Sequence, residues 1–393
     1  MAAAEALFVH HPDTAHYKFN EDHPFHPHRL TLTIDLLERT GVLREHNISS
    51  QERVSEEMLA LIHRPDYIRL VSSLSLAGPD RWMIEEADRY GLRTEDTPYF
   101  RGMHDAASLI VGGTVHAAEM VMTGRCKHAY HLAGGLHHAF PDKGAGFCVY
   151  NDAAVAIAHI RQRYGARVMY VDTDVHHGDG VQWAFYADPN VLTYSIHETG
   201  KFLFPGSGFV HERGTADGFG ACCNVPVEPY TEDESWLECF RYTVEKAAAA
   251  FKPDVIVSQH GCDAHAFDPL SHTHCSMQIY AEMPAVIHEL AHRYAQGRWI
   301  ATGGGGYDIR RVVPRAWALV WLEMSDHPLA GRLRAGDREA VLPSSWIDRW
   351  ADSDEQPLPA TWLDSTDDWP PMPRRAEITE RNRATMRIAV QDF

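Results

Sequence analysis

Short runs of apolar residues recur along the chain, and each closes on or near Gly, His or Asp. The runs cover residues 6–9, 128–132, 168–171, 191–196, 255–258 and 299–301. Longer stretches of helical character, such as residues 151–164 and 234–251, lie between many of them. Nearly continuous apolar strands that alternate with helices are typical of a parallel sheet with both faces covered. The pattern therefore predicts an α/β fold, with a mainly parallel β-sheet flanked by helices on both faces.

The domain organisation follows from this pattern more than from length. A chain of 393 residues could hold two domains, but neither an internal repeat nor a low-complexity linker occurs before about residue 325. From Ala330 onward the chain is rich in Pro, Trp and Asp. We therefore predict a single domain over residues 1–325 and, over residues 326–393, a C-terminal extension that packs on it.

Polar segments follow four of the predicted strands. They cover residues 131–138, 172–179, 259–265 and 303–307, and they are rich in His, Asp and Gly. In open α/β sheets, ligands bind at the carboxyl ends of the strands. Four polar loops at one sheet edge are hard to explain by packing alone, so the sequence predicts a functional site at that edge.

The segment Asp172-Thr173-Asp174-Val175-His176 carries the strongest chemical signal. Residues two apart in an extended chain share a face, so Asp172, Asp174 and His176 point the same way. Carboxylate and imidazole donors together suit a divalent cation, and Asp263, after another predicted strand, offers a third ligand. Three protein ligands leave positions open for water and a substrate oxygen, as a catalytic metal site needs. The alternative is a hydrogen-bonded turn at a strand end.

Two adjacent histidines, His137 and His138, follow the glycine pair Gly134-Gly135. The pair could belong to a structural loop. Asp172 and Asp179 are available, however, to accept hydrogen bonds from the Nδ1–H groups of two imidazoles. A carboxylate partner fixes the tautomer and raises the basicity of the other nitrogen, as general acid/base chemistry requires. These four side chains are therefore candidates for catalysis.

Four glycines, residues 303–306, precede Tyr307. They permit backbone conformations and close approaches that other residues do not allow. Such a loop presents Tyr307, whose hydroxyl could donate to a developing oxyanion. A glycine-rich loop could instead bind phosphate, but no Lys-Ser/Thr pair follows it as in a P-loop.

Composition narrows the classes of function. The chain has 36 basic and 54 acidic residues and a net charge of −18 at pH 7, a field that repels nucleic acid and favours cationic partners such as lysine-rich peptides or polyamines. Its apolar stretches are shorter than the roughly 18 residues of a membrane span, and the N-terminus has no basic lead. The seven cysteines include no C-x-x-C pair. We therefore expect a cytoplasmic protein with free thiols that binds neither nucleic acid nor membrane.

Together these motifs resemble the histone deacetylase family, class I-like, on the arginase/deacetylase fold, and within it the bacterial acetoin-utilisation deacetylase branch. The resemblance covers roughly residues 5–325. It includes further motifs at residues 23–30 (HPFHPHRL), 94–98 (TEDTP), 136–138 (LHH), 146–152 (GFCVYND), 204–208 (FPGSG) and 303–308 (GGGGYD). It implies a zinc-dependent hydrolase that removes acetyl from N-ε-acetyl-lysine in a protein or peptide, releasing acetate and free lysine.

The resemblance also assigns roles to individual residues. One zinc ion per chain would be bound by Asp174, His176 and Asp263. The catalytic groups would be His137, His138, Tyr307, Asp172 and Asp179. Substrate would be bound by Asp96 at the rim, by Gly146, Phe147, Phe204 and Leu270 in a lysine tunnel, and by Arg29 beside an inner acetate cavity. A structural potassium ion would be bound through Asp172, Asp174, His176 and Ser195, with a second monovalent site near Phe185 and Val191.

Three other functions fit parts of the pattern. An arginase-like enzyme with two manganese ions would need acids where this chain has Gly178 and Gly261, so we reject it. An acetylpolyamine deacetylase shares the chemistry, and the acidic charge fits both substrates, so it stays as the alternative. A catalytically inactive acetyl-lysine binder would lack Tyr307, a metal ligand or the histidine pair, and none of these is lost.

Overall fold

An eight-stranded parallel β-sheet forms the centre of the molecule, in the order β2-β1-β3-β8-β7-β4-β5-β6. The computed structural model describes residues 4–76, 78–352, 356–366, 369–391 and 393. The strands are β1 (Ala4–Val9), β2 (Ile48–Ser49), β3 (Cys126–His131), β4 (Val168–Asp172), β5 (Val191–Glu198), β6 (Cys222–Val227), β7 (Val255–Gln259) and β8 (Trp299–Thr302). Each pairing between them is parallel. The predicted α/β class with a parallel sheet is confirmed.

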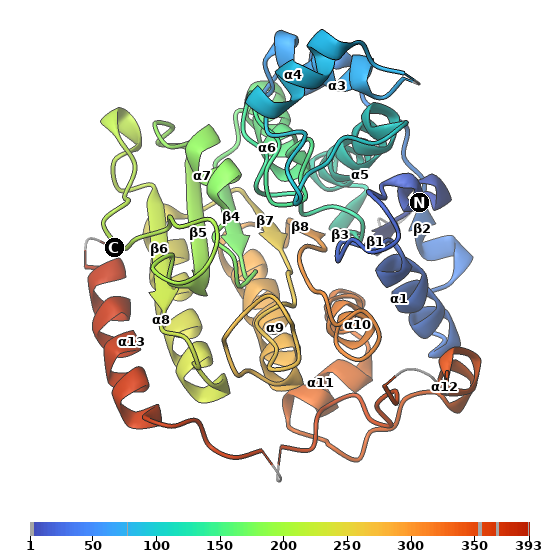
Figure 1. Cartoon of the computed structure of the whole chain (residues 1–393). Coiled ribbons are helices and arrows are strands. Elements are labelled where there is room, and N and C mark those ends of the chain that lie inside the picture. The colour runs from blue at the N-terminus through green and yellow to red at the C-terminus, as the bar shows by residue number, and fades with distance from the viewer. Residues whose placement is uncertain (1–3, 77, 353–355, 367–368, 392) are drawn as a thin grey trace.

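Helices cover both faces of this sheet (Figure 1). On one face, α5 (Met103–Met122) and α6 (Asp152–Tyr164) pack against each other and against the sheet. The other face is covered by α1 (His28–Arg39), α8 (Asp233–Phe251), α9 (Met277–Tyr294) and α10 (Val313–Met324). β4 and β7 are buried along their whole length, which explains their apolar composition without alternation. Shorter helices are α2 (Glu56–Leu59), α3 (Pro65–Leu74), α4 (Arg81–Arg89), α7 (Asp179–Ala184) and the 3-10 helices η1 (Pro12–His16), η2 (Glu45–Asn47) and η3 (Ala216–Gly218).

The predicted elements are present with small shifts at their ends. All six predicted strands form, and their ends differ from the prediction by at most two residues. The predicted helices over residues 151–164 and 234–251 correspond to α6 and α8. α6 begins at Asp152 because the Asn151 side chain accepts a hydrogen bond from the Ala154 N–H at 2.9 Å and so caps the helix. The pattern did not predict β2 and β6.

The C-terminal segment runs along the outside of the sheet and its helices. It contains α11 (Pro328–Arg334), α12 (Ser344–Trp350) and α13 (Arg375–Ala389), and α13 packs on α8 and β6 at the sheet edge (Figure 1). Trp346 and Trp362 are buried. Arg315 of α10 pairs with Asp364 at 2.8 Å. The segment thus contacts the sheet layer at several points, while the division between residues 325 and 326 stays a prediction.

The seven cysteines are buried and free of disulfides, as their scattered spacing predicts. Burial raises the pKa of the Cys126 thiol to about 12, so it stays protonated. Among the described residues, no helix combines the length and the apolar character that crossing a membrane demands.

Candidate active site

Four strand ends meet at one edge of the sheet. β3, β8, β7 and β4 are consecutive neighbours, and backbone hydrogen bonds join the loops that follow them. The Thr173 N–H donates to the Gln259 carbonyl at 3.1 Å, and the His260 N–H donates to the Gly303 carbonyl at 3.0 Å. The polar loops that the sequence places at strand ends therefore lie side by side.

Asp174, His176 and Asp263 form a buried group of three possible metal ligands. Nδ1 of His176 lies 3.2 Å from Oδ1 of Asp174 and 3.0 Å from Oδ2 of Asp263. Gln259 and the Gly305 N–H donate hydrogen bonds to Oδ2 of Asp174, at 2.7 and 2.8 Å, which leaves Oδ1 facing the group. Mixed carboxylate and imidazole donors suit zinc. The residues present therefore fit a divalent cation.

The charges of this group also favour a cation. Burial, followed by the neighbouring carboxylate of Asp174, raises the pKa of Asp263 to about 6. Burial alone would lower the pKa of His176, but hydrogen bonds to Asp174 and Asp263 raise it well above its usual value. Two buried carboxylates thus share one protonated imidazole, because a buried charge without a partner is costly. A divalent cation can take the place of that proton.

His137 and His138 lie beside this group, and each has a carboxylate partner. Nδ1 of His137 is 2.8 Å from Oδ2 of Asp172, and Nδ1 of His138 is 2.7 Å from Oδ1 of Asp179. The Nε2 atoms of the two rings are 2.9 Å apart. Because each carboxylate holds an Nδ1 atom, it fixes which nitrogen of the ring is left for chemistry.

The two imidazoles carry different charges. Burial alone would lower the pKa of His137, but the carboxylates of Asp172 and Asp174 raise it to about 9. Burial, followed by the charge of His137, holds the pKa of His138 well below its usual value. Burial raises the pKa of Asp179 to about 7. At neutral pH this arrangement pairs a cationic His137 with a neutral His138, which can accept a proton.

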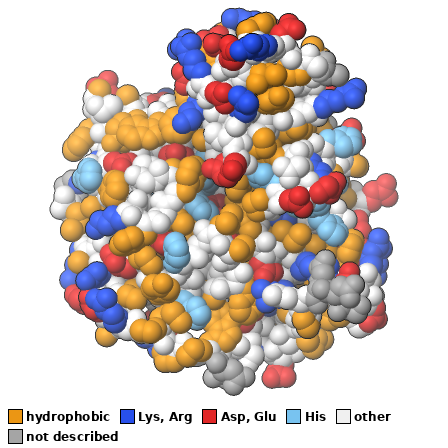
Figure 2. Space-filling view, in the orientation of Figure 1, with side chains coloured by type: hydrophobic (Ala, Val, Ile, Leu, Met, Phe, Trp, Pro, Cys, Tyr) orange, Lys and Arg blue, Asp and Glu red, His pale blue; other side chains and the backbone are white. Residues whose placement is uncertain are grey.

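A largely apolar cavity of about 380 Å³ reaches these groups from the surface. Its lining contains His138, His176 and five predicted substrate-binding residues, Asp96, Gly146, Phe147, Phe204 and Leu270. Phe204 packs edge-on against His138, with ring centroids 5.0 Å apart. A Cβ on Gly146 would lie 2.4 Å from the His138 ring, so a larger residue would close the space. In the view of Figure 2, histidine and hydrophobic side chains gather near the middle of the molecular surface.

Tyr307 lines the same cavity, next to Phe147. Their rings meet edge to face, with centroids 5.6 Å apart. Burial, followed by the charge of Asp263, raises the pKa of Tyr307 well above its usual value, so its hydroxyl stays a donor. A Cβ on Gly305 would lie 2.1 Å from Oδ2 of Asp263. The loop can therefore pass this close to the metal group only with glycine at position 305.

Arg29 lies outside the larger cavity and lines a separate small one. Its Nη1 donates to the carbonyl oxygens of Gly304 and Gly306, each at 3.0 Å. Its guanidinium lies over the rings of Phe25 and Trp317, at 4.1 and 5.0 Å. The side chain of Arg29, a residue of α1, therefore contacts the glycine loop that carries Tyr307.

Known proteins resemble this chain in both sequence and fold. The histone deacetylase domain model matches residues 23–324. The chain is 49% identical to the acetoin utilization protein AcuC of Bacillus subtilis (strain 168) over 386 residues, which cover 98% of this chain and 97% of that protein. It is 44% identical to AcuC of Staphylococcus xylosus over 376 residues, 95% of this chain and 94% of that protein. The chain belongs to the histone deacetylase family.

Two solved structures resemble this deacetylase-family chain. A crystal structure of an HDAC homolog complexed with SAHA has a TM-score of 0.80 and 26% identity, and the match covers 98% of this chain and 100% of that one. An HDAC homolog from Aquifex aeolicus has a TM-score of 0.80 and 25% identity, with 96% and 100% covered. The resemblance to the family and to its acetoin-utilisation branch is confirmed. The chain is thus a hydrolase of the deacetylase type, from a family that is in general zinc-dependent.

Three buried residues support this deacetylase site without having been predicted as part of it. Asp152 accepts hydrogen bonds from the N–H groups of residues 135 and 136, at 3.0 and 2.7 Å, and so holds the loop that carries the histidine pair. Gln259 orients Asp174. Asp268 accepts from the Tyr307 N–H at 2.7 Å, and burial, followed by the charge of Asp263, raises its pKa to about 8. Asp152 ends the motif over residues 146–152 and Gln259 begins the predicted polar segment 259–265, whereas Asp268 lies in neither.

The residues predicted to bind monovalent cations lie in two places. Asp172 and Ser195 are register partners on β4 and β5, and the Asp174 N–H donates to Oδ1 of Asp172 at 3.2 Å. Phe185 and Val191 flank a turn in which the Asp188 N–H donates to the Phe185 carbonyl at 2.9 Å. Potassium binding at either place stays a prediction.

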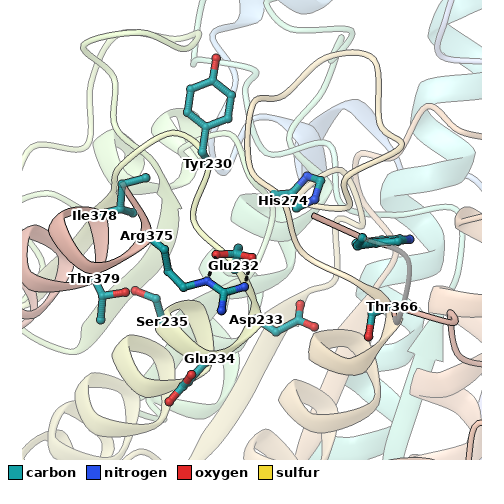
Figure 3. A pocket seen from close by; sticks show the side chains of 11 residues that line it. Tyr230, Glu232, Asp233, Glu234, Ser235, His274, Thr366, Arg375, Ile378 and Thr379 are labelled. Atoms are coloured by element: carbon teal, nitrogen blue, oxygen red, sulfur yellow. Dashed lines mark hydrogen bonds and ion pairs between the residues drawn. The ribbon is translucent and has the colours of Figure 1, made fainter. Parts of the chain in front are cut away.

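Another cavity, of about 230 Å³, lies between the start of α8, the loop at His274 and α13 (Figure 3). At its centre Arg375 donates to both carboxylate oxygens of Glu232, at 2.5 and 2.6 Å. Its lining includes neither the metal group nor the histidine pair. This cavity therefore lies where the C-terminal segment contacts the start of α8 and the loop at His274.

Proposed function

We propose that this chain hydrolyses the acetyl amide of N-ε-acetyl-lysine in proteins, with one zinc ion per chain. The observation that carries the proposal is the buried group of Asp174, His176 and Asp263 next to the histidine pair, at an apolar cavity open to the surface. Zinc bound there would polarise the acetyl carbonyl and acidify a water molecule. The rest of the chemistry comes from the side chains of this chain.

His138 takes the proton from the attacking water and later gives it to the leaving lysine amine, because its pKa is low and its Nε2 is free of the carboxylate. His137, held cationic by Asp172, stabilises the negative charge that develops nearby. The Tyr307 hydroxyl, which stays protonated, donates to the oxyanion. Asp172 and Asp179 keep the two imidazoles in orientation.

The shape of the cavity supports acetyl-lysine as the substrate. Phe147 and Phe204 offer apolar walls to the aliphatic lysine stem, and an uncharged acetamide loses less hydration on entry than a free ammonium would. A kinetic comparison of acetyl-lysine peptides with acetylated polyamines tests the proposal. We expect the higher kcat/KM for peptides, whereas a clear preference for acetylated polyamines would establish the small-amine alternative.

The rim residue Asp96 offers a sharper form of the same test. We expect Asp96→Ala to lower kcat/KM for a peptide by about 10- to 100-fold, because a hydrogen bond to a charged group contributes roughly 1.5–3 kcal/mol. A small acetylated amine has no peptide backbone for Asp96 to hold, so its turnover should change little. Glu95→Ala is the matched control, since Glu95 is also exposed and lines the same cavity. Equal losses on both substrates would remove Asp96 from the substrate-binding residues.

A further inference from the structure

Three histidines outside the active site direct their Nε2 atoms at one another. His128 lies on β3, and His288 and His292 lie on α9. The Nε2 atom of His288 is 3.1 Å from that of His128 and 3.1 Å from that of His292, and the third distance, from His128 to His292, is 3.4 Å. Among the described residues, this trio and the active-site group are the two sets of three close metal-ligand atoms.

Hydrogen bonding alone does not account for this arrangement. A neutral imidazole has a single N–H, and Nδ1 of His288 lies 3.1 Å from Oε1 of Glu323, so it donates its proton there. The Nε2 atom of His288 then carries a lone pair that points at two other imidazole nitrogens. A cation between the three rings would bind all three lone pairs at once.

The distances fit a tetrahedral metal ion. Zn–N bonds are about 2.0–2.1 Å long, so two imidazole nitrogens on one tetrahedral zinc are roughly 3.3 Å apart. The three observed separations, 3.1, 3.1 and 3.4 Å, lie close to this value. Three imidazole donors suit zinc, copper or nickel better than calcium or magnesium.

The surroundings hold the His288 ring in position. Glu323 pairs with His288 and also accepts from Arg334 at 3.3 Å, so its carboxylate is itself fixed. A carboxylate on the far nitrogen of a metal-ligating histidine is the usual support of such a ligand. The His288 ring also stacks on the buried Trp299, with centroids 5.5 Å apart and planes 28° apart.

The sequence of α9 contains the matching spacing. His288 and His292 are four residues apart in His288-Glu289-Leu290-Ala291-His292, so they share one face of the helix. Glu289 is 67% exposed and forms an ion pair with Arg293. It is therefore engaged at the surface and does not serve as a base for hydrolysis, which argues for a binding site without a second hydrolytic activity.

The site is open on one side. A cavity of about 480 Å³ is lined by His288 and His292 together with acidic and basic side chains, whereas His128 is fully buried at the inner side. Oε1 of Glu5 lies 3.9 Å from Nε2 of His128. A fourth ligand can therefore come from water or from this carboxylate.

We propose that His128, His288 and His292 bind one zinc ion that joins α9 to β3, separately from the active-site metal. His292→Ala tests this, because His292 is the exposed member of the trio and its loss leaves the core packing intact. Tag-free full-length protein is incubated with Zn²⁺, freed of excess by dialysis and analysed for metal. His46→Ala, at an exposed histidine in η2, is the matched control.

We expect wild type and His46→Ala to contain one zinc ion per chain more than His292→Ala. Added Zn²⁺ should also raise the Tm of metal-depleted wild type by more than that of metal-depleted His292→Ala, since an ion that binds only the folded state stabilises it. Deacetylase activity should be the same in all three, because the trio lies outside the active site. Equal zinc content in wild type and His292→Ala, at equal helix content, would overturn the proposal.

Discussion

An Asp263→Ala variant is expected to lose tight zinc binding and deacetylase activity together. Asp263 is one of only three protein groups proposed to hold the ion, and its Oδ2 lies 3.0 Å from Nδ1 of His176. A catalytic zinc site keeps a position open for water and has no spare ligand, so losing one of three releases the ion. Elemental analysis and turnover of an acetyl-lysine peptide measure the two losses. We expect activity to fall below detection.

A control for this variant separates the loss of the negative charge of Asp263 from the loss of its structural hydrogen bond. Oδ1 of Asp263 accepts a hydrogen bond from the Val175 N–H at 2.9 Å, so alanine also removes a structural contact. Asp263→Asn keeps an acceptor there and removes only the negative charge, and it should be folded and inactive as well. Both Asp263 variants are made in the His292→Ala background, so that the second proposed site does not add a zinc ion to the measured metal content. If the variant retained one zinc ion per chain and full turnover, the assigned ligand set would be wrong.

The elements that the sequence predicted best are the buried ones. β4 is apolar up to its last residue and β7 over its first three residues, because helices cover both of their faces. β6 was missed because Asn224 and Pro226 interrupt its apolar run. Pro226 is tolerated there since β6 is an edge strand, whose one partner among the described strands is β5. β2 has two residues, too few for any periodicity to appear.

Parts of the candidate site, too, could be predicted from the sequence, and other parts could not. Asp172, Asp174 and His176 are two apart in the sequence, but only Asp172 belongs to β4, and the chain bends over residues 174–176 instead of continuing as a strand. The shared face expected for an extended chain therefore does not explain their proximity. It comes from a turn in which the Asp174 and His176 N–H groups each donate to Oδ1 of the carboxylate two residues earlier, at 3.2 and 3.0 Å. Asp263 reaches His176 across 87 residues because β4 and β7 are neighbours in register, with Asp172 opposite Gln259. Residue patterns show that both segments follow strands but cannot show that the two strands are adjacent. The sequence alone could therefore only offer Asp263 as a third ligand, and the family resemblance assigned it to the same site as Asp174 and His176.

The different roles of the two adjacent histidines also needed the structure. His137 and His138 are identical in type and both pair with a carboxylate. The charge of Asp174 acts to raise the pKa of both rings, but His137 also has Asp172, whose charge and hydrogen bond raise its pKa further. His138 instead lies next to His137, whose charge lowers the pKa of His138 further. Three-dimensional neighbours, and not residue type, make one of them a cation and the other a base.

A Tyr307→Phe variant is expected to lose on the order of 10²–10³ in kcat, or about 3–4 kcal/mol of transition-state stabilisation, because it lacks one preorganised oxyanion donor. The ring should keep its edge-to-face contact with Phe147, whose centroid is 5.6 Å away. KM should change less than kcat, since the hydroxyl's main partner is the charge that develops on the carbonyl oxygen. Zinc content should be unchanged because the phenol is not proposed as a ligand.

A purely structural role for the glycine loop makes the opposite prediction. In that case Tyr307→Phe would lower stability, while the folded fraction would keep a near-normal kcat. Steady-state kinetics, a thermal unfolding curve and metal analysis on the same preparation separate the two. Tyr242→Phe, which removes the hydroxyl of a half-exposed tyrosine on α8, is the matched control and should leave all three unchanged. A stable, zinc-replete Tyr307→Phe enzyme with wild-type kcat would exclude the oxyanion role of Tyr307. The metal and His137 would then have to stabilise the oxyanion without it.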